Sequence, residues 1–200
     1  MQQLATVCQR ERRWLVDLIR ELVAVESPST DRAALERCAS VWAARATEAG
    51  ANVARVPAIT TADHVVASWS GAGPPILLIG HFDTVWPVGQ LERMPLRETD
   101  GRLFGPGIFD MKAGLAIGLL AVRALVETRD AARRPQVQFL ATSDEEVGST
   151  TSRTLIESLA RACSATTLER VPPSTRPTLI EMPRAGSFSA SSATIWRASS

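Results

Sequence analysis

Apolar positions near the start of the chain recur every three or four residues, which is the spacing of one face of a helix. They are Leu15, Leu18, Ile19, Leu22 and Val23. The turn-forming run Ser27-Pro28-Ser29 predicts the end of this first helix. Asp31 is a candidate N-cap for a second helix, which Gly50 ends.

Shorter apolar runs further along the chain predict strands. They cover residues 52–57, 64–70, 76–79 and 136–142. The unbroken run at 76–79 predicts a buried central strand, and helical patterns follow from Met111 and from Thr151. Residues 84–107 are rich in glycine and proline and predict a long connection, with a short strand at 102–104. Helices that alternate with apolar strands predict an α/β sandwich.

Length and charge exclude several classes of protein. The 200 residues allow one domain, or a domain with a fragment, and a formal net charge of +1 gives no general attraction to nucleic acid or to an anionic membrane. No apolar stretch approaches the ~20 residues of a membrane-spanning helix. Arg10, Glu11, Arg12 and Arg13 interrupt the N-terminus, so we expect a cytoplasmic protein without a secretory signal.

Cysteine usage points away from thiol chemistry. The three cysteines, Cys8, Cys38 and Cys163, are an odd number at wide spacing. This pattern favours neither a disulfide framework nor a cysteine-based zinc site, and we expect buried or idle thiols.

Chemistry-bearing residues gather at the ends of predicted strands, where α/β sheets place their sites. The clusters are His81-Phe82-Asp83, Asp110, and Asp144-Glu145-Glu146. A histidine can bind a metal while a nearby aspartate holds its ring in the correct tautomer. Of two adjacent glutamates, one can be a metal ligand and the other a general base. Donors of this kind, without a thiolate, suit zinc, with manganese or cobalt as alternatives.

Each cluster also has a simpler interpretation. A His-x-Asp pair occurs on ordinary surfaces, an acidic run suits a solvated face or a helix N-terminus, and Asp110 could be an N-cap. Independent surface features have no reason to share a placement at strand ends, which favours one common site. His64 has no such neighbours in sequence, and we expect it to be structural or solvent-facing.

Three segments together resemble successive signatures of the M20 family of zinc metallopeptidases, closest to its glutamate carboxypeptidase (carboxypeptidase G2-like) branch. They are residues 80–85 (GHFDTV), 105–114 (GPGIFDMKAG) and 142–149 (TSDEEVGS), and the resemblance covers roughly residues 10–160. It implies a three-layer sandwich of a mixed, mainly parallel sheet with flanking helices. It also implies hydrolysis of an amide in a small peptide or N-acyl amino acid, with release of a C-terminal amino acid for which glutamate is a candidate. The intact family is expected to form homodimers.

The same resemblance implies a role for each site residue. In this family two zinc ions share an aspartate and a bridging water. By resemblance, His81 binds one zinc, Asp110 bridges both and Glu146 binds the other. Asp83 orients His81, and Glu145 is the base that activates the bridging water and later protonates the leaving amine.

The sequence also departs from the family pattern. Met111 stands where the family commonly has Asp or a small polar residue, which we expect to be tolerated because that side chain is not a ligand. The family takes two further zinc ligands from downstream, an acidic residue and a distal histidine. Glu169 lies near the expected acidic position without the surrounding pattern, and His64 and His81 are the only histidines. We therefore expect zinc to bind weakly, or as a single ion.

The character of the chain changes near Arg161. Residues 161–200 hold 13 Ser or Thr and four Pro, without an apolar period. Either this is a natural disordered tail, or it is read out of frame. The near absence of lysine indicates GC-rich DNA, which yields residues of this kind when read out of frame, and we favour this second alternative. We therefore divide the chain into 1–160, the N-terminal part of a catalytic domain, and 161–200, an irregular tail. The alternative to an enzyme is a non-catalytic, degenerate fragment that acts as a metal-binding or interaction module.

Overall fold

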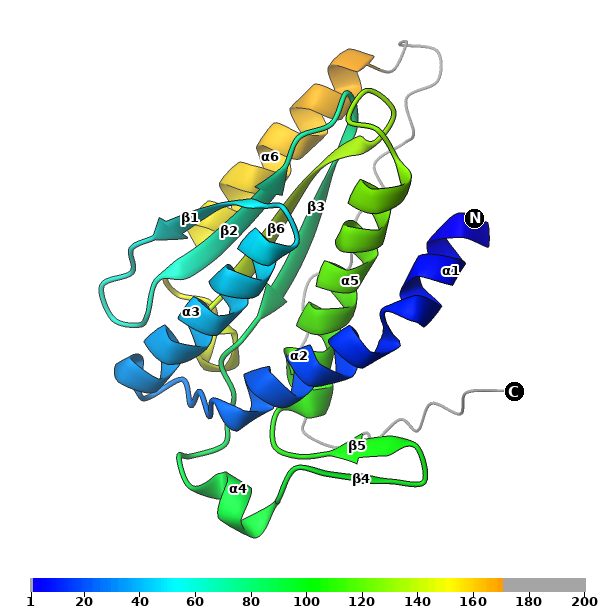
Figure 1. Ribbon diagram of the computed structural model, residues 1–200. Coiled ribbons are helices and arrows are strands. Elements are labelled where there is room, and N and C mark those ends of the chain that lie inside the picture. Colours follow the sequence, from blue (N-terminus) through cyan, green and yellow to red (C-terminus); the bar gives the residue numbers. More distant parts are fainter. Residues whose placement is uncertain (1, 171–200) are drawn as a thin grey trace.

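The computed structural model describes residues 2–170 as helices packed on both faces of one sheet (Figure 1). The helices are α1 (Gln2–Arg10), α2 (Arg12–Ala24), α3 (Arg32–Glu48), α4 (Gln90–Arg93), α5 (Ala113–Thr128) and α6 (Arg153–Arg170). The strands are β1 (Asn52–Val56), β2 (His64–Trp69), β3 (Gly73–His81), β4 (Arg97–Thr99), β5 (Arg102–Phe104) and β6 (Pro135–Thr142). Two short helical segments, η1 (Ile108–Lys112) and η2 (Glu145–Val147), precede α5 and α6. None of the described helices combines the length and apolar character needed to cross a membrane.

The main sheet has the strand order β1-β2-β6-β3. β3 and β6 are parallel, whereas β1–β2 and β2–β6 are antiparallel. The expected mixed sheet with flanking helices is confirmed, but the expectation of mainly parallel pairing is wrong for the described strands. For β1 and β2 the reason is the short link of residues 57–63, which leaves no room for a crossover helix.

β3 is not the buried central strand that its apolar run predicts. Within residues 2–170 it pairs only with β6 and forms an edge of the sheet, and Ile76 and Ile79 remain 42% and 45% exposed. Leu78 packs against the core from the face that α5 covers. An apolar run indicates a strand, but it does not tell how many neighbours that strand has.

The core lies between the sheet and helices α2, α3 and α5, with α6 on the opposite face (Figure 1). Trp42 of α3 meets Phe139 of β6 edge to face, with ring centroids 5.2 Å apart. Gly118 lets α5 approach the same ring, since a Cβ there would lie 2.7 Å from Phe139 Cε1. The Asp31 cap of α3 is confirmed by its bond from Ala34 N at 3.0 Å.

The last described helix crosses the expected division of the chain at residue 160. α6 runs without a break through residues 161–170, where we expected an irregular tail to begin. This short stretch keeps good helix formers such as Ala162 and Leu168, which the Ser and Thr count of the whole segment conceals. Residues 171–200 lie outside the described part of the chain, and the division at residue 160 stays a prediction.

Candidate active site

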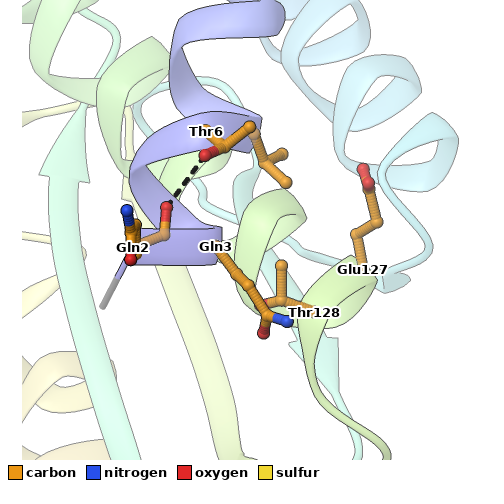
Figure 2. Close-up of a pocket in the computed structure, with 6 residues that line it drawn as sticks. Gln2, Gln3, Thr6, Glu127 and Thr128 are labelled. Atoms are coloured by element: carbon orange, nitrogen blue, oxygen red, sulfur yellow. Dashed lines mark hydrogen bonds between the residues drawn. The ribbon is translucent and has the colours of Figure 1, made fainter.

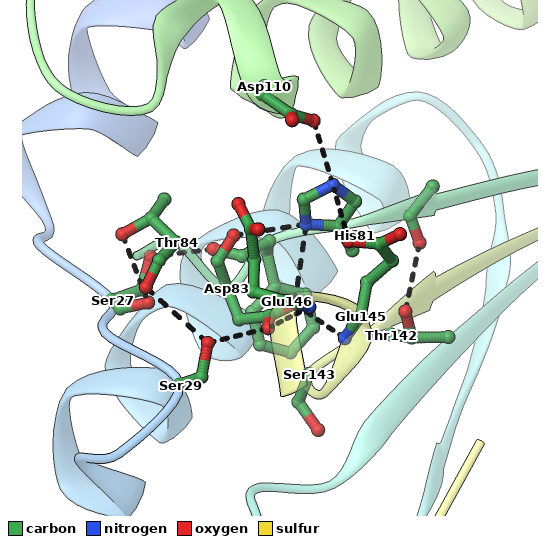
Figure 3. Close-up of polar contacts among 12 residues, drawn as sticks. Ser27, Ser29, His81, Asp83, Thr84, Asp110, Thr142, Ser143, Glu145 and Glu146 are labelled. Atoms are coloured by element: carbon green, nitrogen blue, oxygen red, sulfur yellow. Dashed lines mark hydrogen bonds and ion pairs between the residues drawn. The ribbon is translucent and has the colours of Figure 1, made fainter. Parts of the chain in front are cut away.

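His81 is the last residue of β3 and is almost completely buried. Its Nδ1 lies 3.0 Å from the backbone oxygen of Asp83, to which a protonated Nδ1 donates, and 3.3 Å from Asp83 Oδ1. Its Nε2 faces the other way, 3.0 Å from Asp110 Oδ1 and 3.7 Å from Glu145 Oε2 (Figure 3). One ring nitrogen is thus held by the protein, and the other is directed at carboxylates.

Asp83 is fully buried, and its carboxylate connects two loops. It accepts hydrogen bonds from the Ser29 hydroxyl at 2.8 Å and from the backbone N–H groups of Glu145 and Glu146, both at 3.1 Å (Figure 3). The buried charge is therefore satisfied by three donors, as well as by the imidazole of His81. Asp83 holds His81 in place, and it also holds the backbone that carries the two glutamates.

Asp110 comes from the irregular segment η1, in which Asp110 and Met111 have non-helical backbone angles. Gly107 starts this segment at φ +68°, and a Cβ there would lie 2.6 Å from Thr84 Cγ2. The segment is anchored by Lys112, whose buried ammonium group donates to the carbonyls of Leu22 and Val25 at 2.9 Å each. The Asp110 side chain itself is 68% exposed, so it reaches out from a fixed backbone.

Glu145 and Glu146 open η2, directly after the loop that leaves β6. Asp144 precedes them and points away, because its buried carboxylate accepts from Thr151 N at 2.7 Å and from Ser152 N at 3.2 Å. Within the run of three acids, Asp144 therefore supports the loop, and Glu145 and Glu146 carry their side chains to the site.

His64 supports the same loop from β2. Its Nδ1 accepts from Ser143 N at 3.3 Å, and its Nε2 lies 3.0 Å from Thr151 Oγ1. Burial lowers the pKa of His64, which favours the neutral ring that such an acceptor needs. His64 is structural, one of the two roles expected for it, and it is buried rather than solvent-facing.

Three of the expected site residues meet at one point. Ligand atoms of His81, Asp110 and Glu146 all lie within 4.8 Å of one another. Glu145 stands beside them, with its side chain 53% exposed. The cluster lies where the carboxyl ends of β3 and β6 meet, since His81 pairs with Thr142 in the parallel register.

The electrostatics of this cluster are dominated by negative charge. Burial by itself lowers the pKa of His81, but the hydrogen bond and charge of Asp83 outweigh that effect. With the charge of Glu145 added, the pKa of His81 rises to about 9. Burial, and then the charge of Asp110, raises the pKa of Glu146. A bound cation would reduce the electrostatic repulsion among the carboxylates that surround this imidazole.

The donor set fits a divalent metal ion. It provides one imidazole nitrogen and two carboxylate oxygens, with no thiolate, which suits zinc. The tautomer is also suitable, because a hydrogen bond from Nδ1 to the Asp83 carbonyl leaves Nε2 for a metal.

A hollow between α1 and α5 lies apart from this cluster (Figure 2). It is lined by Gln2, Gln3, Thr6, Val7, Glu127 and Thr128. Glu127 is the one ionisable side chain among these six, and it already accepts from Arg10 at 2.6 Å. This hollow offers no set of metal donors, so the chemistry is concentrated at the strand ends.

Comparison with known proteins agrees with this geometry. A family model described as peptidase family M20/M25/M40 matches residues 77–179, just over half of the chain. The chain belongs to this family. The match includes His81, Asp110 and Glu146, which form the cluster, and Glu145 beside it.

This M20-family chain is similar to several known enzymes. It is 30% identical over 156 residues to carboxypeptidase G2 of Pseudomonas sp. (strain RS-16), covering 76% of the chain and 37% of the relative. It is 35% identical over 142 residues to succinyl-diaminopimelate desuccinylase of Leptothrix cholodnii, covering 66% and 36%. The crystal structure of human carnosine dipeptidase 1 is similar with a TM-score of 0.63 and 25% identity, covering 78% and 37%. The chain thus spans just over a third of the length of these relatives.

Some supporting residues of the candidate site have no signal in the sequence pattern. Ser29 donates to Asp83, and Ser27 donates to the carbonyl of Phe82 at 2.6 Å. Both belong to the Ser27-Pro28-Ser29 run, which by itself indicates only a turn. Asp144 stood out as part of an acidic run, but nothing in that run separates its supporting position from the exposed positions of its neighbours.

Proposed function

We propose that this chain carries the metal-binding part of an amide hydrolase that releases a C-terminal amino acid, with glutamate as the first candidate. The observation that supports this proposal best is the convergence of His81, Asp110 and Glu146 within 4.8 Å, beside Glu145. Membership of a peptidase family supports the same reaction class.

In the proposed site, His81, Asp110 and Glu146 would hold zinc, and Asp110 would be the ligand common to two ions if two were bound. When bound, zinc polarises the scissile carbonyl and lowers the pKa of the attacking water. Asp83 keeps the His81 ring oriented through its backbone oxygen and its carboxylate. The bonds from Glu145 N and Glu146 N to the same carboxylate fix the backbone of both glutamates.

Glu145 is the proposed general base. Its Oε2 lies 3.7 Å from His81 Nε2, which places an exposed carboxylate at the edge of the ligand cluster. Oε2 takes a proton from the attacking water, whose oxygen bonds to the scissile carbon. The same proton then passes to the leaving nitrogen as the C–N bond breaks, so Glu145 returns to its starting state.

The substrate class follows from the names of the relatives. These describe a carboxypeptidase, a desuccinylase and a dipeptidase. A small peptide or an N-acyl amino acid is the substrate common to such names. A homodimer and a cytoplasmic location stay predictions.

A second candidate is a metal-binding module without catalysis. Among residues 2–170, the one group of three or more metal-type donors is His81, Asp110 and Glu146. If Asp110 is shared by two ions, each ion has two protein ligands, whereas catalytic zinc usually keeps three. On its own, the chain would then bind one ion weakly.

Metal binding and turnover separate the two candidates. Zinc content after equilibrium dialysis is measured for the purified chain and for Glu146→Gln, with Glu92→Gln on α4 as the matched control away from the site. We expect Glu146→Gln to reduce bound zinc and Glu92→Gln to leave it unchanged. Equal zinc content in all three proteins would refute the site.

Turnover of an N-acyl glutamate is then followed with and without a chelator. Glu145→Gln should retain zinc, because Glu145 is a base in this proposal and not a ligand. Turnover that is lost in this variant and with chelator supports the hydrolase, whereas zinc binding without turnover supports the non-catalytic module.

A further inference from the structure

A hollow of about 460 Å³ opens directly beside the candidate metal ligands. Asp110 and Glu146 form one part of its lining, and the apolar side chains of Val85, Trp86, Met94 and Phe109 form another. Any molecule that fills this hollow therefore touches two of the three candidate ligands. Its volume lies within the range of small-molecule sites in proteins.

The apolar side chains of this hollow are unusually exposed. Phe109 is 79% exposed, Val85 66% and Trp86 36%. Large apolar side chains that gather in water at a concave site mark a binding surface more often than a gap in packing. Two of them are also close to the ligands in sequence, since Val85 lies four residues after His81 and Phe109 lies directly before Asp110.

The loop that carries Val85 and Trp86 is fixed at both ends. On one side, Thr84 N donates to Ser27 O at 2.9 Å, and Ser29 N donates to Thr84 O at 3.2 Å. On the other side, the Glu26 carboxylate accepts from Gly89 N at 2.7 Å and from Leu91 N at 2.8 Å. These bonds hold the apolar wall in place before a ligand arrives, which lowers the entropy cost of binding.

The charge of the lining indicates which end of a substrate enters. Its ionisable groups are the carboxylates of Asp110 and Glu146, and no lysine or arginine lies among the described lining residues. With zinc held by these two carboxylates, the rest of the lining offers no cationic side chain to pair with the free carboxylate of a released amino acid. An uncharged apolar group is complementary to the rest of the wall.

We propose that the Val85–Trp86–Phe109 hollow binds an aromatic or branched apolar group on the acyl side of the scissile amide. This inference rests on the proposed hydrolase function and adds its substrate preference. The acyl group lies between the metal ligands and the apolar wall, and the carboxylate of the leaving amino acid lies elsewhere.

The test uses calorimetric titration of the 200-residue chain in the presence of zinc with two hydroxamates. Acetohydroxamate and phenylacetohydroxamate share the metal-binding group and differ in the phenyl ring. We expect the phenyl compound to bind at least tenfold more tightly. Phe109→Ala and Trp86→Ala should each reduce this ratio to threefold or less while acetohydroxamate binds as before.

Phe104→Ala is the matched control. Phe104 is a partly exposed aromatic residue on β5 that lines the neighbouring groove next to Phe109 but not this hollow. The ratio should remain at least tenfold in this variant. A ratio that falls in Phe104→Ala and persists in Trp86→Ala would place the phenyl ring in the other groove and overturn the proposal.

The remaining outcomes also decide the question. Equal affinity for the two compounds overturns the apolar subsite and leaves the metal site standing. A phenyl preference that survives both Phe109→Ala and Trp86→Ala overturns the assignment to these residues. Absence of zinc-dependent binding of either compound overturns the proposed function itself, and the subsite with it.

Discussion

Replacement of Asp83 by asparagine tests how the site is held together. The variant keeps the shape of the side chain but removes its charge and replaces one acceptor oxygen with an NH₂ group. Three donors point at the native carboxylate: the Ser29 hydroxyl and the backbone N–H groups of Glu145 and Glu146. The single oxygen of asparagine can accept from one of the two backbone N–H groups, and the other N–H group then faces the NH₂ group of asparagine, which is itself a donor.

The magnitude follows from these contacts. A hydrogen bond to a charged group contributes about 1.5–3 kcal/mol, and a buried donor without a partner costs about 1–3 kcal/mol. Because Asp83 is fully buried, solvent does not replace the lost bonds. We expect Asp83→Asn to lower the free energy of unfolding by about 3–5 kcal/mol, the usual cost of breaking a buried charged pair.

The assay is urea unfolding of the metal-free chain near pH 7. Asp17→Asn is the matched control, because Asp17 is exposed and its contact with Arg13 one turn away is 3.8 Å long. Exposed pairs of this kind contribute about 0.3–0.5 kcal/mol. A loss below about 1 kcal/mol in Asp83→Asn would refute the argument that this carboxylate organises the two loops.

Three further predictions follow from the same contacts. In the metal-free chain the free energy of unfolding should fall as pH rises from 6.5 to about 9, because folded His81 keeps its proton up to the higher pKa while the unfolded chain releases it near 6.5. Below pH 6.5 the free energy of unfolding should also fall as the pH falls, since burial lowers the pKa of His64 and the unfolded chain therefore binds a proton on this residue before the folded chain does. Unfolding is measured from pH 5 to 9; a free energy of unfolding that increases with pH above 6.5, or a pH profile that His81→Asn leaves unchanged, contradicts this. The 200-residue chain should bind zinc weakly, with at most one ion per chain by dialysis; two tightly bound ions would contradict the ligand count. Gly107→Ala should lower the free energy of unfolding by about 2 kcal/mol more than Gly101→Ala, because both have positive φ but only Gly107 faces an atom, Thr84 Cγ2, at 2.6 Å, and equal losses in urea unfolding would contradict the close approach.

The sequence pattern predicted most elements because each depends on local periodicity or a local turn. The capped start of α3 at Asp31 and its end before Gly50 are examples, since the cap and the left-handed turn involve residues that are adjacent in sequence. The neighbours of β3 could not be predicted in this way. Ile76 and Ile79 form an apolar run in either case, and only the strand order shows that β3 is an edge within the described residues.

The candidate site divides along the same line. His81, Asp110 and Glu146 follow predicted strands or turns, so their convergence could be expected from the sequence. The donors to Asp83 could not, because Ser29 lies 54 residues away along the chain. The apolar hollow was also missed, since Trp86 and Phe109 lie in irregular segments without a period that could assign them to a face.

The position of the site has a simple origin in the sheet. β3 and β6 form its one parallel pair among the described strands, so the segments that follow both strands leave at the same edge. β2 runs antiparallel to β6, with Val65 opposite Ala141, so its first residue, His64, reaches that edge as well. His81, Glu145 and Glu146 therefore come from the ends of two strands, Asp110 comes from η1, and a main support for the loop of the two glutamates comes from the start of a third strand. If β2 ran parallel to β6, His64 would lie at the opposite edge of the sheet, away from Ser143, while every candidate ligand would stay in place. The supporting residues of the site therefore depend on strand direction more than the candidate ligands do.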